Sequence, residues 1–341
     1  MRDITTADKV AFLRSPAAYP GLVGPVDVEE THMSWVFLVD ERVYKLKKPV
    51  RYPFLDFTTI EARKANCREE VRLNLRLARE VYLGVVPLAV GADGVLAFGE
   101  DGEIVDWLVE MRRLPAERML DKAIAINTVS RQSVRAVARL LCDFYQGATA
   151  ETISGPDYVG QFAHEQAINR DVLTRSDFDL DRSRVEMALR VVEERLRERP
   201  HTLEQRAASG KIVEGHGDLR PEHVCLIRPP AIIDCLEFSR RLRLVDPVDE
   251  LLFLGLECQR LGAGWIGRLI IDTYTQRTRD DPETGLISFY WAYRGCLRAR
   301  LSLVHLIESD TRSPQKWLPL ARHYIELATA PPVRQSLREA R

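Results

Sequence analysis

The hydrophobic pattern of this 341-residue chain changes once along its length, and that change constrains the fold more than any other feature. Before residue 111, short runs of β-branched and aromatic residues are separated by turn residues, and only one long segment has helical spacing. From residue 111 onward helical spacing dominates, with one β-rich interruption. The sequence therefore predicts an α+β fold with a small β-rich N-lobe and a larger, mainly helical C-lobe.

The N-lobe is predicted to span residues 1–110 and to form mainly a β-sheet. A tight turn at Asp40-Glu41 joins its first two β-rich runs into a hairpin. Helical spacing predicts a short leading helix at 5–14 and one long helix at 58–79. Strands are expected at 35–39, 42–47, 85–90, 95–99 and 104–111.

The C-lobe is predicted to span residues 111–330, and the Arg-rich residues 331–341, which begin with two prolines, to form a loose tail. The one β-rich interruption of the C-lobe lies between 215 and 238. Helices are expected at 130–147, 157–176, 182–198, 247–262, 265–279, 284–307 and 313–328.

Composition narrows the class of protein. Hydrophobic residues make up 45% of the chain, which is enough for a sizeable core, and no run is long enough for a membrane span. The formal charge is −1 with acids and bases mixed, so we expect neither a nucleic-acid nor a membrane partner. The six cysteines form no C-x-x-C pair, and the polar N-terminus does not resemble a signal peptide. These features favour a cytoplasmic protein. They do not indicate an oligomeric state.

The interrupting segment, 215-GHGDLRPEHVCLIRPPAIIDCLEF-238, has acidic residues at both ends of a predicted hairpin. Its apolar runs at 224–228 and 231–233 would pair antiparallel, which brings the loop before the first to the residue after the second. We therefore expect Asp218 and Asp234 to be neighbours. Two carboxylates in this arrangement could act as a general base and as a metal ligand, because the charge of the metal ion offsets the repulsion between them. The alternative is that both acids cap turns.

These motifs resemble those of a known family. GHGDLRPEHV resembles the catalytic loop H-G-D-x-x-x-x-N of aminoglycoside phosphotransferases and related small-molecule kinases, which is itself similar to that of protein kinases. IIDCLEF resembles the strand that delivers the metal-binding Asp of these enzymes. The resemblance implies a bilobal protein-kinase-like fold in which Asp218 is the catalytic base and His216 supports its loop. It further implies that Asp234 holds Mg²⁺ against the phosphates of ATP.

Two further strings extend the resemblance. The segment 246-DPVDELLFL-254 resembles one that braces the catalytic loop in this family, which implies a structural role for Asp246 and Asp249. Strings such as VYKLKKPV and FLDFTTIEARKANCREE resemble bacterial phosphotransferase-like domains that are often fused to an ATPase domain with a Walker A loop. This sequence contains no G-x-x-x-x-G-K-[ST], so we expect that second domain to be absent and this fold alone to hold the nucleotide.

The kinase-like fold also needs a strand lysine for the nucleotide phosphates and a helix glutamate that pairs with it. Lys45 and Lys47 share one face of their strand, and Lys45 better fits the V-x-K pattern. Glu70 shares a helix face with Leu73, whereas Glu69 lies on the arginine-rich side, so Glu70 is the predicted partner. The alternative is that these are surface charges without a catalytic role.

Two departures from the family pattern concern the phosphates and the metal. No G-x-G-x-x-G is present, and Ser34 with nearby backbone amides is the candidate phosphate contact in its place. His223 stands where the family has Asn, although Mg²⁺ prefers oxygen ligands. Either His223 binds the metal through water or favours Mn²⁺, or Glu222 or Glu237 supplies the oxygen, or the second metal site is lost. We favour an active enzyme with altered metal coordination.

The resemblance also suggests where nucleotide and acceptor bind. Glu110 and Met111 are the candidates for the segment that contacts adenine. Arg294 and Arg298 share a helix face with Trp291 and are candidate contacts to the acceptor.

The predicted function is an ATP-dependent phosphotransferase, a kinase, acting on a hydroxyl of a small molecule such as a sugar, amino sugar or other polyol. The alternatives are a nucleotide-binding pseudokinase that regulates a partner, and a phosphotransferase that acts on protein.

Overall fold

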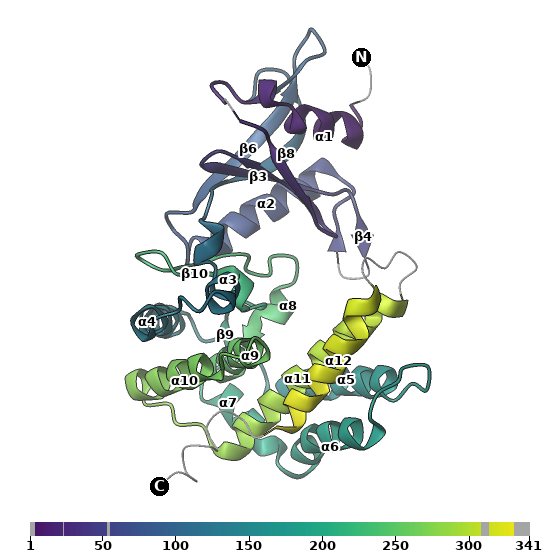
Figure 1. The fold of residues 1–341 in the computed structure, drawn as a ribbon, viewed down its shortest axis with the longest axis vertical. Coiled ribbons are helices and arrows are strands. Elements are labelled where there is room, and N and C mark those ends of the chain that lie inside the picture. The colour runs from purple at the N-terminus through teal and green to yellow at the C-terminus, as the bar shows by residue number, and fades with distance from the viewer. Residues whose placement is uncertain (1–3, 23, 53–54, 308–313, 331–341) are drawn as a thin grey trace. The chain divides into compact units, whose positions relative to one another are not determined.

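The computed structural model describes residues 4–22, 24–52, 55–307 and 314–330 (Figure 1). The chain divides into two compact units. The first, here the β unit, comprises Met1–Met119 and His223–Leu242, and the second, the helical unit, comprises Leu120–Glu222 and Arg243–Arg341. The first unit ends its N-terminal segment at residue 119 and also includes the predicted hairpin, and the predicted lobe boundary at residue 110 stays a prediction. The predicted loose tail, 331–341, lies outside the described residues.

The β unit contains a six-stranded antiparallel sheet with the order β1-β2-β3-β8-β6-β7. The predicted hairpin at Asp40-Glu41 is confirmed as the β2–β3 connection, with Asp40 in the left-handed region at φ 45°. The first strand of the sheet was not predicted. The strands are β1 (Asp27–Glu30), β2 (Ser34–Val39), β3 (Arg42–Lys47), β6 (Tyr82–Val90), β7 (Leu96–Phe98) and β8 (Glu103–Arg112), and a separate pair is formed by β4 (Arg51–Tyr52) and β5 (Leu55–Asp56).

Two helices pack on this sheet. The leading helix α1 (Thr6–Arg14) begins with a capping box between Thr5 and Asp8, and α2 (Ile60–Asn74) begins at the N-cap Thr59. Both helices were predicted. The second ends at Asn74 rather than near residue 79, and the Asn74 side chain bonds back to the carbonyl of Glu70.

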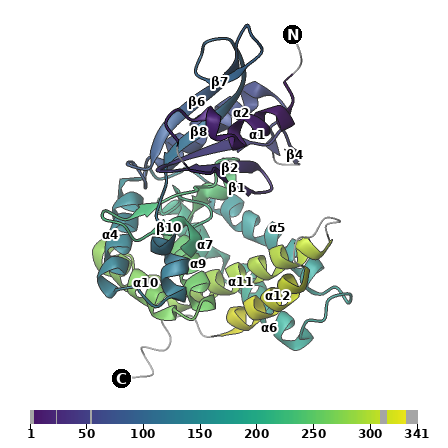
Figure 2. The same ribbon diagram turned by 45° about the horizontal axis from the view of Figure 1, so that its top comes forward.

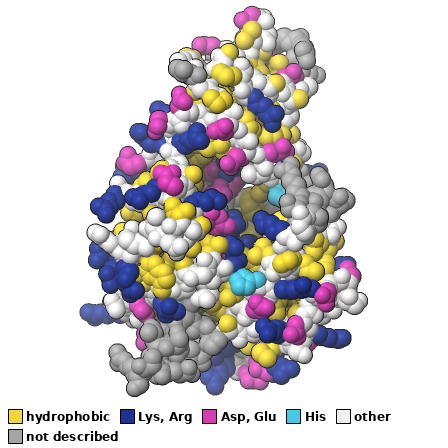
Figure 3. All heavy atoms as spheres, in the orientation of Figure 1, with side chains coloured by type: hydrophobic (Ala, Val, Ile, Leu, Met, Phe, Trp, Pro, Cys, Tyr) yellow, Lys and Arg dark blue, Asp and Glu magenta, His cyan; other side chains and the backbone are white. Residues whose placement is uncertain are grey.

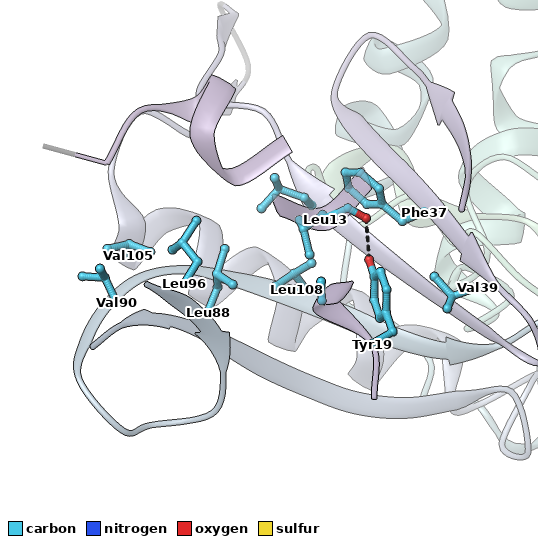
Figure 4. Close-up of a cluster of buried hydrophobic side chains, with 11 residues drawn as sticks. Leu13, Tyr19, Phe37, Val39, Leu88, Val90, Leu96, Val105 and Leu108 are labelled. Carbon is cyan, nitrogen blue, oxygen red and sulfur yellow. Dashed lines mark hydrogen bonds between the residues drawn. The ribbon is translucent and has the colours of Figure 1, made fainter. Parts of the chain in front are cut away.

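The two faces of the sheet carry separate apolar clusters. Because side chains alternate along a strand, Leu108 of β8 packs with Leu13 of α1 on one face, whereas Trp107 packs with Cys67 of α2 on the other. Figure 4 shows the α1 cluster, in which the Tyr19 hydroxyl donates a hydrogen bond to the Leu13 carbonyl at 2.8 Å. The sheet is therefore fixed between α1 and α2.

A buried ion cluster joins these three layers. Asp106 of β8 accepts hydrogen bonds from Lys9 Nζ of α1 at 2.8 Å and from Arg63 Nε and Nη2 of α2 at 2.8 and 2.9 Å. All three side chains are almost fully buried. Burying an unpaired charge is costly, so Lys9 of α1 and Arg63 of α2 can be buried here because both contact the carboxylate of Asp106.

The helical unit is built mainly from helices that pack on one another. Figures 1 and 2 show α11 alongside α12, and α11 also packs on α5, α6 and α9. The helices are α3 (Leu120–Ala125), α4 (Arg131–Gly147), α5 (Gly155–Leu173), α6 (Arg182–Glu198), α7 (Pro200–Ala208), α9 (Pro247–Arg260), α10 (Gly264–Thr278), α11 (Thr284–Ile307) and α12 (Pro314–Thr329), with α8 (Arg240–Arg243) at the boundary between the units and a short pair of β9 (Val213–Glu214) with β12 (Leu244–Val245).

A second buried ion cluster organises the helical unit. Asp246, the N-cap of α9, accepts two hydrogen bonds from Arg206 of α7 at 2.6 and 2.7 Å. Arg206 also donates to Asp280, before α11, at 2.6 and 2.8 Å. This agrees with the structural role predicted for Asp246.

Two general findings concern the surface and hydropathy. On the face drawn in Figure 3, acidic and basic side chains are interspersed. In the described ranges, no helix combines the length and the apolar character that crossing a bilayer requires.

We predict that Asp106→Ala lowers the free energy of unfolding by about 3–5 kcal/mol, because it leaves Lys9 and Arg63 buried without their carboxylate. Urea denaturation checks this, with the exposed Asp101→Ala as the matched control. A loss no larger than that of the control would show that the cluster contributes nothing to stability.

Candidate functional site

The two lysines of β3 converge on one buried glutamate of α2. Lys45 Nζ donates a hydrogen bond to Glu70 Oε1 at 2.9 Å, and Lys47 contacts the other oxygen, Oε2. Each lysine also reaches the loop after β11 (Ala231–Ile232), since Lys45 contacts Asp234 Oδ1 at 2.8 Å and Lys47 contacts Glu237 Oε1 at 2.5 Å. The five side chains form a chain of alternating charges that links β3, α2 and this loop.

The charges in this chain support one another. Burial raises the pKa of Glu70, but Lys45 and Lys47 outweigh that effect and hold the pKa below its ordinary value. Burial lowers the pKa of Lys45, but Asp234 and Glu70 raise it well above its ordinary value. Both groups are therefore ionised at neutral pH, despite the complete burial of Glu70.

The predicted hairpin is confirmed as β10 (Val224–Cys225) paired antiparallel with β11 (Ala231–Ile232). Asp234 follows it in the left-handed region at φ 62°, a conformation that non-glycine residues rarely adopt. Two contacts hold the backbone there: the Asp234 N–H donates to the Tyr82 hydroxyl at 3.2 Å, and the Cys235 N–H donates to Asn74 Oδ1 at 2.9 Å. The fold thus fixes the direction of the Asp234 carboxylate.

The Asp234 carboxylate is half-exposed and lies beside His223, whose Nε2 is 3.5 Å from Oδ2. Burial raises the pKa of Asp234, but Lys45, His223 and Lys47 together outweigh that effect, so the pKa lies well below its usual range. The carboxylate is thus ionised and open to a ligand.

The carboxylate of Asp234 is compatible with a metal ion that also binds the phosphates of a nucleotide. Among the described residues, no group of three or more His, Cys, Asp and Glu side chains is arranged to hold a metal ion. Mg²⁺ is commonly bound by one or two carboxylates together with substrate phosphates and water, and Asp234 fits that mode. Of the predicted alternative oxygen donors, Glu237 pairs with Lys47, and Glu222 pairs with Arg220 in the helical unit.

The predicted catalytic loop lies in the helical unit and is held through its backbone. Glu250 of α9, which is buried, accepts the His216 N–H at 3.0 Å and the Gly217 N–H at 2.6 Å, and the Tyr145 hydroxyl donates to it at 2.7 Å. Gly215 leaves no space for a side chain, because a Cβ would lie 2.7 Å from a Glu250 oxygen and 2.4 Å from Val245. The loop is therefore built around one carboxylate.

Asp218 projects from this braced loop. Its N–H donates to Nδ1 of the buried His216 at 3.3 Å, which is a contact within the loop that His216 is predicted to support. Its Oδ2 accepts a hydrogen bond from Arg220 Nε at 3.0 Å. Asp218 and Asp234 lie in different units, so their predicted proximity stays a prediction.

The predicted nucleotide contacts lie in the β unit. Ser34 is almost fully buried at the start of β2. The Glu110 carboxylate accepts from Arg42 at 3.3 Å and from the Tyr44 hydroxyl at 3.2 Å, and the Met111 side chain packs in the α2 cluster. Since β8 pairs with both β3 and β6, the backbones of Glu110 and Met111 are engaged in the sheet.

The two predicted acceptor contacts differ in their surroundings. Arg294 is buried and donates to both oxygens of Asp249 at 2.8 and 2.7 Å, which gives this pair a structural role. Arg298 is partly exposed and donates to Glu257 at 2.8 Å. The Arg298 side chain is therefore more exposed, at 19%, than that of Arg294, at 11%.

Sequence reasoning missed several contacts that hold these residues. The brace at Glu250 has only a weak signal, a third acid near the start of α9. The bond from Cys235 to Asn74 and the contact of Arg220 with Asp218 have no motif of their own. Lys47 was considered only as an alternative to Lys45, yet it contacts the same Glu70.

We predict that Glu70→Gln lowers stability by about 3 kcal/mol at pH 7, because it removes a buried carboxylate that two lysines contact. The folded pKa of Glu70 lies below its ordinary 4.5, so its contribution is present above about pH 4.5 and is lost as the pH falls below that. Urea midpoints at about pH 7, 5 and 3 should therefore fall less steeply in the variant than in the wild type. The neighbouring Glu69→Gln is the control, and equal slopes would contradict the assignment.

Comparison with known proteins places this geometry in context. No family model matches the chain. Proteins of Mycobacterium tuberculosis and Mycobacterium bovis, both described as uncharacterised, are 30% identical over 303 residues, which is 88% of this chain. The chain spans 58% of the length of these relatives. Their descriptions assign no activity and mention no ATPase domain, so the predicted likeness to ATPase-fused domains stays a prediction.

Solved structures share the fold at low identity. A choline/ethanolamine kinase family protein from Mesorhizobium loti matches with a TM-score of 0.55 and 14% identity, covering 98% of both chains. Spectinomycin phosphotransferase, in complex with ADP and spectinomycin, matches at 0.55 and 12%, covering 97% of this chain and 100% of its own. A Streptomyces rimosus aminoglycoside phosphotransferase, in complex with ADP and streptomycin, matches at 0.50 and 17%, covering 85% and 98%. The predicted fold is confirmed: the chain has the protein-kinase-like fold of the aminoglycoside phosphotransferases and choline/ethanolamine kinase-like proteins.

Proposed function

We propose that this protein is an ATP-dependent phosphotransferase that phosphorylates a hydroxyl of a small molecule. The observation that carries the proposal is the position of Lys45, which contacts Glu70 of α2 and Asp234 after β11 from its place on β3. A lysine held by a helix glutamate beside a metal-binding carboxylate is the arrangement that fixes nucleotide phosphates in kinase-like folds. The ADP in solved neighbours of this fold supports a nucleotide ligand.

Phosphoryl transfer then follows from positioning and charge. The acceptor O–H gives its proton to Asp218, its oxygen forms a bond to the γ-phosphorus of ATP, and the bond to the β-phosphate oxygen breaks, which releases ADP. Lys45 holds the phosphates, and Glu70 keeps Lys45 charged and in place. His216 and the Glu250 brace hold Asp218 for proton transfer.

A divalent ion, Mg²⁺ or Mn²⁺, would neutralise the phosphate charge when bound. Asp234 is the residue that would hold it, with His223 as a neighbour or as a partner through water. Among the predicted nucleotide contacts, Ser34 and the chain around Glu110 and Met111 remain candidates for phosphate and adenine.

A regulatory protein that binds nucleotide without turnover is the second candidate. His223 favours it, because this imidazole lies 3.5 Å from the carboxylate that would hold the metal. If the protein is instead a phosphotransferase that acts on protein, the phosphate label of labelled ATP would appear on protein when ATP consumption is measured.

We predict that Asp218→Asn lowers transfer from ATP to a small-molecule acceptor by at least about 100-fold, because the variant cannot take the hydroxyl proton. ATP consumption with a library of hydroxyl compounds, measured with Mg²⁺ and with Mn²⁺, checks this. Asp177→Asn is the matched control, since Asp177 also pairs with an arginine two residues away but is exposed. Tight nucleotide binding without turnover in either metal would contradict the proposal and favour the regulatory alternative.

A further inference from the structure

Three arginines of the helical unit gather near the predicted base. Arg220 contacts Asp218 directly, with Nη2 2.9 Å from Oδ2. The other two, Arg260 of α9 and Arg298 of α11, share the carboxylate of Glu257, which accepts from their Nε atoms at 2.7 and 2.8 Å. The three guanidiniums thus come from the loop and from two helices packed on each other.

Glu257 fixes both of its arginines from below the surface. It is fully buried, and the Tyr324 hydroxyl donates to its two oxygens at 2.7 and 2.9 Å. The Arg260 and Arg298 side chains are 20% and 19% exposed, so each is largely buried but keeps part of its surface open to solvent. A guanidinium held in this way loses little rotamer freedom when it binds an anion.

The outer nitrogens of these two arginines are available to a ligand. No described residue accepts a hydrogen bond from Arg298 Nη1 or from either terminal nitrogen of Arg260. Burial lowers the pKa of Arg298, but Glu257, Tyr324 and, more weakly, Asp218 raise it above its ordinary value. Arg298 therefore lies within electrostatic reach of the predicted base.

Two of the three acidic groups of the cluster are engaged by arginines at hydrogen-bond distance. Asp218 contacts Arg220, and Glu257 is buried between its two arginines. Glu222 has one oxygen 3.6 Å from Arg220, and its second oxygen is buried and accepts no hydrogen bond from a described residue. Although the formal charges of the three arginines and three carboxylates cancel, Asp218 and Glu257 are each paired with arginine, whereas Arg260 and Arg298 keep N–H donors for a ligand.

We propose that the acceptor is an alcohol that carries an anionic group, a carboxylate or phosphate, which Arg260 and Arg298 bind while its hydroxyl faces Asp218. Guanidiniums bind both anions through paired N–H···O bonds. This inference rests on the proposed phosphoryl transfer and narrows its acceptor. It separates this protein from neighbours that bind cationic acceptors such as streptomycin.

The test uses three sugars that share the ring of glucose but differ in charge: D-glucuronate is anionic, D-glucose is neutral and D-glucosamine is cationic. Their binding to the full chain, saturated with ADP, is measured by calorimetry. We expect glucuronate to bind about tenfold more tightly than glucosamine, with glucose between them. Arg298→Gln and Arg260→Gln should each remove most of this preference, whereas the surface variant Arg277→Gln, on α10, should keep it. Thermal unfolding of each variant confirms that it is folded.

Equal binding of the three hexoses, tighter binding of glucosamine, or no binding of any would overturn the inference. A preference that survives in both arginine variants would also overturn it, since another site would then hold the anion. The outcome is separable from that of the proposed function, because binding is measured without turnover. Lost anion preference with intact ATP turnover rejects only the acceptor class, and anion preference without turnover rejects the transferase while keeping the anion site.

Discussion

The contact of Lys45 with both Glu70 and Asp234 is the interaction on which the rest of the β unit depends. A glutamate with no exposed surface is costly unless cations contact it, and here two lysines of one strand do so. Their spacing on β3, the position of α2 and the loop after β11 must all agree for the charges to meet. The sheet, the helix and the hairpin are therefore parts of one electrostatic arrangement.

A buried carboxylate also organises the helical unit, but its partners there are backbone N–H groups rather than lysines. Glu250 accepts two N–H groups of the loop that carries Asp218, and the buried pair of Asp246 with Arg206 fixes the start of the helix that carries Glu250. In the helical unit, the buried Glu250 holds the loop that carries the partly exposed Asp218. In the β unit, the buried Glu70 holds Lys45, which contacts the half-exposed Asp234. That division between buried support and an accessible group is what positioning for catalysis requires.

How far the sequence could predict this arrangement depends on the range of each interaction. The β2–β3 hairpin, the β10–β11 hairpin and the pairing of Lys45 with Glu70 follow from local periodicity together with the family resemblance, and the structure agrees with all three. The sharing of Glu70 by Lys47, the brace at Glu250 and the burial of Arg294 depend on packing between distant segments. No local pattern encodes them. The unit boundary is a similar case, since residues 223–242 join the β unit only through contacts with segments such as the end of α2.

The central claim is that Lys45 holds the phosphates of a nucleotide, and nucleotide affinity tests it most directly. The measurement is the dissociation constant of ATP and of adenosine for the wild type, for Lys45→Met and for the surface variant Lys122→Met. The account predicts that Lys45→Met weakens ATP binding by about tenfold or more, while adenosine binding and the Lys122→Met variant are unchanged. Equal affinity of the wild type and Lys45→Met for ATP, with both proteins folded, would contradict it.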